Sequence, residues 1–266
     1  MIAVLLLMIV AGIGLAQAVS DPYAVSLRWL RLGGIIAVTL GAVAMTATII
    51  TGVQDRRLPA ARVFDGALIV FIVLLPFIVQ LVTVQLGQRK VQRIAAGAGY
   101  LLLGGVAWGA LAAMRHVDAS SLPPTDWKLL APAYLTSGLL GGCLMAMLLG
   151  HAYLTAGGEM TQAPFRRLVI MLGILLALRA ATSLVFGLVP YLARPPQGAN
   201  LWPLVMITAR YAVGLFVTGI FTWMAYDCVK RRANQSATGI LYVTTVLIFI
   251  GEWSALSLYE STGLVF

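Results

Sequence analysis

Long apolar runs separated by short polar breaks dominate the hydrophobic pattern of this chain. Each run has about 20 residues or more, enough to cross roughly 30 Å of hydrocarbon at about 1.5 Å per residue in a helix. We expect these spans at residues 1–19, 32–53, 66–87, 94–114, 131–156, 168–192, 201–229 and 238–258. The pattern predicts an all-α integral membrane protein, a compact bundle of about eight transmembrane helices forming a single domain over residues 1–266.

Composition supports a protein that contacts the lipid bilayer over most of its surface. The chain is 61% hydrophobic and 10% charged, a balance typical of a polytopic membrane protein. Its net charge of +9 comes from basic residues in short loops beside the apolar runs, a placement that sets topology and attracts anionic lipid. No basic cluster is interleaved with aromatic residues, so we expect no nucleic-acid partner.

The first apolar run ends in Ala16-Gln17-Ala18, a sequence that resembles a signal-peptidase site. A signal peptide begins with a positively charged region, whereas apolar residues follow Met1 directly. We therefore expect a retained first helix.

Lysine and arginine are unevenly shared between alternate loops. The first, third, fifth and seventh loops hold ten of these residues, and the second, fourth and sixth hold six. Cytoplasmic loops carry the excess of positive charge in most membrane proteins. We therefore expect both termini on the outer (periplasmic) side of a bacterial cytoplasmic (inner) membrane.

Three ionisable residues lie inside the last three apolar runs: Arg179, Arg210 and Glu252. Such a group within a span costs about 2.5–3.5 kcal/mol on insertion scales, so it needs a partner or a function. Arg210 and Glu252 fall at similar depths on consecutive antiparallel spans, and such spans are usually neighbours. We predict a buried Arg–Glu–Arg cluster in the outer half of the bundle. It is either a functional site or an ion pair that fixes helix register.

A second candidate site lies near the inner end of the fifth span, where Tyr153 follows His151. His151 would exchange a proton or donate a hydrogen bond to a quinone carbonyl, although a lone interfacial histidine is more often a packing residue. It would also ligate a single haem, but no second ligand is evident. His116, Asp118 and Asp126 share one outer loop, but their spacing matches no metal-binding loop and a solvated loop is the simpler interpretation. We predict no metal site.

Close helix packing and a helix kink are predicted at particular small or cyclic residues. Gly105-x-x-x-Gly109 and Gly138-x-x-x-Gly142 have the spacing that lets helix backbones approach closely. Pro76 lies in the middle of the third span and removes one backbone hydrogen bond. Gln80, one turn later, would bond the freed carbonyl or face a partner helix.

Motifs that would name a chemistry are absent from the sequence. Cys143 and Cys228 form no CxxC pair, and two histidines are too few for two bis-histidine haems. There is no Gly-x-Ser-x-Gly, HExxH, Asp-rich prenyl-diphosphate or Gly-rich phosphate motif. An enzyme acting on lipid or peptide within the membrane is therefore the least favoured class.

Two functional hypotheses remain. The first is a non-catalytic or quinone-interacting subunit of a respiratory or photosynthetic redox complex, with partner redox subunits and with quinone or lipid bound. In helix number and length this plan resembles the NrfD/DmsC type of membrane anchor subunit. The second is a small-anion or proton-coupled transporter, in which the arginines would neutralise the substrate and Glu252 would carry the proton. Paired broken helices in the two halves would favour transport, but Pro76 is the only central break that the sequence indicates.

Overall fold

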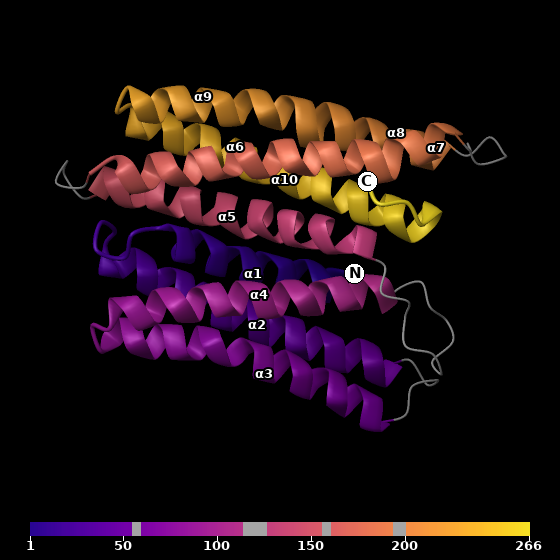
Figure 1. Ribbon diagram of the computed structural model, residues 1–266, viewed down its shortest axis with the longest axis horizontal. Coiled ribbons are helices and arrows are strands. Elements are labelled where there is room, and N and C mark those ends of the chain that lie inside the picture. The colour runs from indigo at the N-terminus through magenta and orange to yellow at the C-terminus, as the bar shows by residue number, and fades with distance from the viewer. Residues whose placement is uncertain (55–59, 114–126, 156–160, 194–200) are drawn as a thin grey trace.

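A computed structural model describes residues 1–54, 60–113, 127–155, 161–193 and 201–266. The described residues are almost entirely helical, and each polar break of the sequence separates two antiparallel helices (Figure 1). In chain order the elements are α1 Ile2–Val19, α2 Leu27–Gln54, α3 Ala60–Gln85, α4 Arg89–Ala113, the short 3₁₀ helix η1 Trp127–Leu129, α5 Leu130–Thr155, α6 Ala163–Ser183, η2 Leu184–Leu188, α7 Val189–Ala193, α8 Leu201–Thr208, η3 Ala209–Val217, α9 Thr218–Lys230 and α10 Asn234–Thr262.

Eight helices within the described ranges are long and apolar enough to cross a membrane, which confirms the predicted fold class. Two of the eight are composite, with α6, η2 and α7 forming one and α8, η3 and α9 the other. Large apolar side chains such as Phe71, Ile72 and Phe216 are exposed along the middle of these helices. Water would not tolerate so much exposed apolar surface, whereas lipid does. The chain is an integral membrane protein.

The helices form two groups that meet along α1 and α5. In Figure 1, α1 to α4 occupy one side of the bundle and α5, α6, α9 and α10 the other, and both termini lie at one end. Helix α1 contacts α2, α4 and α5, while α5 also contacts α6 and α10. The core of the protein therefore lies around α1 and α5, the two spans with the largest buried share.

Glycine makes the contact between α1 and α5 possible. A Cβ atom on Gly12 would lie 1.8 Å from the Ser137 carbonyl oxygen, and one on Gly141 would lie 2.2 Å from the Ile9 carbonyl oxygen. The predicted GxxxG pair of α5 meets only side chains, and Gly109 in α4 has open space around it. On α5 the closest backbone approach is thus made by Gly141, between the two glycines of the predicted motif, and not by the motif itself.

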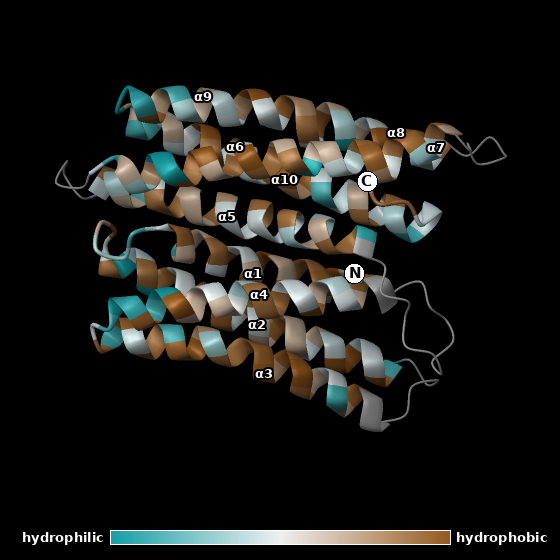
Figure 2. Ribbon diagram, in the orientation of Figure 1, coloured by the Kyte–Doolittle hydropathy of each residue, from teal (hydrophilic) through white to brown (hydrophobic). Residues whose placement is uncertain are grey.

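Most helices begin before the apolar runs from which they were predicted. Helices α2, α4 and α6 begin five residues earlier than expected, and the added turns carry Arg28, Arg89 and Arg166. The sequence pattern marks only the hydrocarbon-crossing part, whereas a helix continues into the interface where arginine reaches the headgroups. Figure 2 shows hydrophilic residues gathered at the α3–α4 and α9–α10 turns, at the end opposite the termini.

Both composite spans contain π-helical hydrogen bonding, in which each N–H bonds five residues back. Segment η3 extends over nine residues, and η2 over five. The Thr218 hydroxyl follows the same spacing and donates to the Val213 carbonyl at 2.9 Å. By contrast, α3 continues through Pro76 as one helix. Irregular helix geometry therefore occurs in two consecutive spans of the second half, and not where proline predicted it.

Candidate functional site

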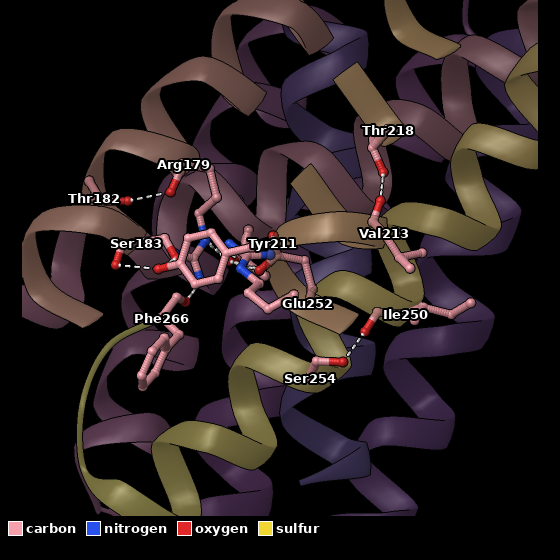
Figure 3. A network of polar contacts seen from close by, with 12 residues as sticks. Arg179, Thr182, Ser183, Tyr211, Val213, Thr218, Ile250, Glu252, Ser254 and Phe266 are labelled. Atoms are coloured by element: carbon pink, nitrogen blue, oxygen red, sulfur yellow. Dashed lines mark hydrogen bonds and ion pairs between the residues drawn. The ribbon is translucent and has the colours of Figure 1, made fainter. Parts of the chain in front are cut away.

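The structure brings Arg179, Arg210 and Glu252 together in the interior of the bundle (Figure 3). Arg210 Nη1 donates to Glu252 Oε1 at 2.7 Å, and Arg179 Nε donates to Glu252 Oε2 at 3.2 Å. Arg210 is 0% exposed, Glu252 is 2% exposed and Arg179 is 3% exposed. They come from η3, α10 and α6, and we call them the arginine–glutamate cluster.

Thr136 on α5 completes the coordination of the carboxylate. Its hydroxyl donates to Glu252 Oε2 at 2.7 Å and accepts from Arg179 Nε at 2.9 Å. Glu252 thus receives three hydrogen bonds, two of them from charged donors, which is the kind of satisfaction that a buried carboxylate requires. No sequence pattern predicted a role for Thr136, which lies six residues from the start of α5. Its depth, matched against Arg210 and Glu252, was the only available signal.

The segment after α10 folds back over the cluster. Gly263 takes a left-handed conformation at φ 76°, ends α10, and turns the following residues towards α6. Arg179 Nη2 donates to the backbone oxygen of Phe266, whose ring is buried against Gly187 and Tyr191. The cluster is therefore covered on the side of the termini by residues 263–266.

Close packing of η3 on α10 sets the short distance between Arg210 and Glu252. A Cβ atom on either Gly214 or Gly251 would lie 2.4 Å from the Cα atom of the other. Gly251 directly precedes Glu252, and Gly214 lies four residues after Arg210. Any larger side chain would separate the two helices at the level of the ion pair.

Tyr211 links the two π-containing spans beside the cluster. Its hydroxyl donates to the Ser183 carbonyl at 2.9 Å and accepts from the Ser183 hydroxyl at 3.0 Å. Ser183 is the last residue of α6 before η2, and Tyr211 lies within η3. Both irregular segments are therefore tied together at the level where the arginines enter the core.

Three guanidinium nitrogens of the cluster find no acceptor among the described residues: Arg179 Nη1, Arg210 Nε and Arg210 Nη2. The side chains of Arg179, Arg210 and Glu252 together carry a net charge of +1, and Arg179 also donates to the Phe266 backbone oxygen. Guanidinium has donors only and stays protonated, so the unmet need is for acceptors and negative charge. A buried charge without such compensation is costly. The cluster has the chemistry of a site that takes an anion.

A small cavity adjoins the cluster. Thr136, Arg179, Glu252 and Phe266 line its polar part, and apolar side chains such as Met8 line the rest. The space that the centre of a water molecule can occupy inside it is about 20 Å³. A single water needs roughly 10–15 Å³ of such space. The cavity thus admits one water-sized species.

His151 and Tyr153 do not join the cluster. His151 is exposed near the end of α5 that lies opposite the termini. The Tyr153 hydroxyl donates to the Thr161 carbonyl at 2.5 Å, and its ring stacks on Phe165 at a centroid distance of 5.3 Å. Tyr153 therefore holds the start of α6 against α5. His116, Asp118 and Asp126 lie outside the described residues, and within the described ranges no three metal-ligating side chains come together.

A second buried polar cluster, which the sequence analysis did not find, lies in the first half of the chain. Gln17 Oε1 accepts from the side-chain amides of Gln80 and Gln92, the latter at 3.2 Å. Gln17 Nε2 donates to the Leu30 carbonyl at 3.1 Å. Gln80 therefore faces a partner helix, the second of its two predicted roles. We call Gln17, Gln80 and Gln92 the glutamine cluster.

Comparisons with protein-family models, with curated proteins and with solved structures find no match to this chain.

Proposed function

We propose that this chain binds a small inorganic anion at the arginine–glutamate cluster and carries it across the membrane with proton coupling at Glu252. The observation that carries the proposal is the presence of three buried guanidinium nitrogens without an acceptor in the described structure. They belong to a cluster with one positive charge in excess, within spans that cross the bilayer. One monovalent anion would supply both the acceptors and the charge.

Glu252 acts in this mechanism as an internal anion that competes with the external one. In the structure its carboxylate occupies Arg210 Nη1 and Arg179 Nε. An anion that arrives at the free nitrogens and then displaces the carboxylate leaves Glu252 without its cationic partners. A carboxylate in that position takes up a proton, because an unpaired charge is costly in the core. Anion entry and proton uptake are thereby coupled.

The cavity is lined by Arg179 and Glu252 but not by Arg210, and it has room for a single small ion such as chloride. A space of about 20 Å³ for the centre of a water molecule takes one water-sized ion. The covering residues 263–266 and the low exposure of the cluster correspond to an occluded state. Two spans with π-helical segments are the elements that would move, since such segments are frequent at functional sites.

A quinone-interacting subunit of a redox complex in a bacterial inner membrane is the less favoured proposal. The cavity beside the cluster is far too small for a quinone ring, so a quinone would have to bind elsewhere on the protein. Co-purification with haem- or cluster-bearing subunits would favour it.

Under both proposals the ten basic residues at the end opposite the termini face the cytoplasm, and the termini face outwards.

The test is a flux measurement in liposomes. Purified protein is reconstituted into chloride-loaded vesicles, chloride release is followed with an electrode, and internal pH is followed with a dye. We expect release that depends on the pH gradient, at least tenfold slower for Arg210→Gln and uncoupled from protons for Glu252→Gln. Arg231→Gln is the matched control, because Arg231 pairs with Asp227 on the surface. Chloride release by wild type no faster than by empty vesicles would overturn transport.

A further inference from the structure

An open apolar groove lies between α6 and α9, on the lipid-facing side of the second half. Its volume is about 480 Å³, and its lining includes Leu176 and Ala180 from α6 with Leu215 and Trp223 from η3 and α9. Trp223 is 68% exposed, so the groove opens towards the acyl chains of the bilayer. It is separate from the small cavity beside Glu252.

Two glycines keep this groove open. A Cβ atom on Gly173 would meet no atom within 4 Å, and one on Gly219 would meet only Leu176 Cδ2, at 3.9 Å. These glycines differ from Gly12 and Gly141, where the missing Cβ allows two backbones to touch. At Gly173 and Gly219 the missing side chains leave space between the helices rather than closing it.

The length of the groove matches one leaflet of a bilayer. Along α6 it extends from Val169 to Ala180, which is about 16 Å of helix. Half of a hydrocarbon core of about 30 Å is about 15 Å. Its headgroup end lies at Val169 and Tyr226, beside the basic end of the bundle, and its other end lies near the midplane.

Among the described residues, cationic side chains stand at the headgroup end of the groove. Arg166 Nη2 donates to the Tyr226 hydroxyl at 3.2 Å, and the guanidinium lies 5.7 Å from the centre of that ring. Arg167, the next residue, is exposed. The nearby carboxylate of Asp227 is paired with Arg231 Nε at 2.8 Å, and no ion pair to Arg166 or Arg167 is formed within the described residues. The groove therefore has a positively charged entrance and an apolar length.

We propose that the groove holds one acyl chain of an anionic phospholipid, with the lipid phosphate bound by Arg166 and Arg167. Charge complementarity selects this occupant: an amphiphile with a negative head and a tail one leaflet long satisfies both parts of the site. A neutral quinone head would offer hydrogen-bond acceptors but no negative charge to compensate the two arginines. The site is independent of the proposed anion pathway, because it shares no side chain with the arginine–glutamate cluster.

The test compares lipid retention by native mass spectrometry. Delipidated protein in detergent is incubated with phosphatidylglycerol, phosphatidylcholine of the same chain length, or a ubiquinone. Each arginine near an anionic headgroup contributes about a fivefold factor in affinity, so two give about a twenty-five-fold preference for phosphatidylglycerol. We expect Arg166→Gln with Arg167→Gln to abolish the preference while either lipid still binds weakly.

A variant that fills the groove distinguishes lipid bound in the groove from anionic lipid attracted to the protein surface in general. Gly173→Leu places a side chain in open space within the groove, so we expect retention of phosphatidylglycerol to fall at least tenfold without loss of folding. Gly239→Leu is the matched control, because a Cβ there also meets nothing within 4 Å and the residue lies on α10, away from the groove. Equal retention of both phospholipids by wild type, preferential retention of the ubiquinone, or unchanged retention by Gly173→Leu would each overturn the proposal.

Discussion

The two halves of the bundle bury polar groups in two different ways. In the first half, three glutamines at the basic end form a neutral network around Gln17. In the second half, two arginines and one glutamate form a charged cluster deeper in the span and nearer the termini. Gln17, Gln80, Gln92 and Arg210 are all 0% exposed, so burial alone does not distinguish the clusters.

The chemistry of the side chains separates them. An amide carries both donors and an acceptor, so a group of amides can close most of its hydrogen bonds internally. Only two carbonyl oxygens, on Gln80 and Gln92, lack a described partner there. Guanidinium has no acceptor, so the donors left over in the arginine–glutamate cluster can be met only by something else. A neutral network is thus sufficient for packing, whereas the charged cluster leaves donors that a bound anion would satisfy under the proposed function.

The largest effect is expected from Glu252→Gln. This change leaves two buried arginines without an anion, and breaking a buried pair costs about 3–5 kcal/mol. Thermal unfolding in detergent, followed by circular dichroism, would measure the loss. Asp227→Asn is the control, since its surface pair contributes at most about 1 kcal/mol. A melting temperature equal to that of wild type would contradict the central role given to Glu252.

A smaller loss is expected from Gly251→Val, which forces η3 away from α10. The new Cβ would lie 2.4 Å from the Gly214 Cα, and overpacking of this kind costs about 1–3 kcal/mol. The same unfolding experiment measures it, with Gly239→Val as the control in open space on the same helix. Equal melting temperatures for the two variants would show that the glycine contact does not hold the ion pair together.

Gln17→Leu tests the glutamine cluster, the neutral one of the two. It removes the acceptor shared by Gln80 and Gln92 and the donor to the Leu30 carbonyl, at a cost of about 1–3 kcal/mol. We expect the loss of stability to be the same in chloride and in gluconate. A chloride-dependent loss would mean that the glutamine cluster also takes part in anion binding.

The smallest effect is expected from removal of the anion itself. A ligand at ten times its dissociation constant stabilises the folded state by about 1.4 kcal/mol, so wild type should melt earlier in gluconate than in chloride. Gln17→Leu should keep this difference and Arg210→Gln should lose it. Loss in both variants, or in neither, would remove the distinction between the two clusters.

Hydropathy and helix length were enough to predict the spans. The hydrocarbon core requires apolar side chains, and its thickness fixes how long each helix must be. The contact of Arg210 with Glu252 followed from their equal depth on neighbouring antiparallel helices. Nothing comparable pointed to Gln17, since a single amide near the end of an apolar run is also common at the interface. Its partners come from α3 and α4, so only the tertiary arrangement shows that it is buried.

The π-helical segments were equally beyond a sequence argument. Segment η3 has an ordinary apolar composition, and within it Gly214 packs against Gly251 of α10. The backbone oxygen of Phe266 belongs to the same class, because the fold-back at Gly263 brings it to Arg179. Both features arise from packing between elements, which local residue patterns do not encode.

Arg210 lies in η3, where each backbone hydrogen bond spans one residue more than in an α-helix. If the segment returned to α-helical pairing, the chain before it would shift by one residue, about 1.5 Å and about 100° of rotation. Because Gly214 is held against Gly251, the rotation would fall on Arg210 and swing it away from Glu252. The hydrogen-bond ladder of η3, rather than a side-chain rotamer, would then decide whether the carboxylate is neutralised. A register slip of one residue in η3 would therefore be enough to separate Arg210 from Glu252.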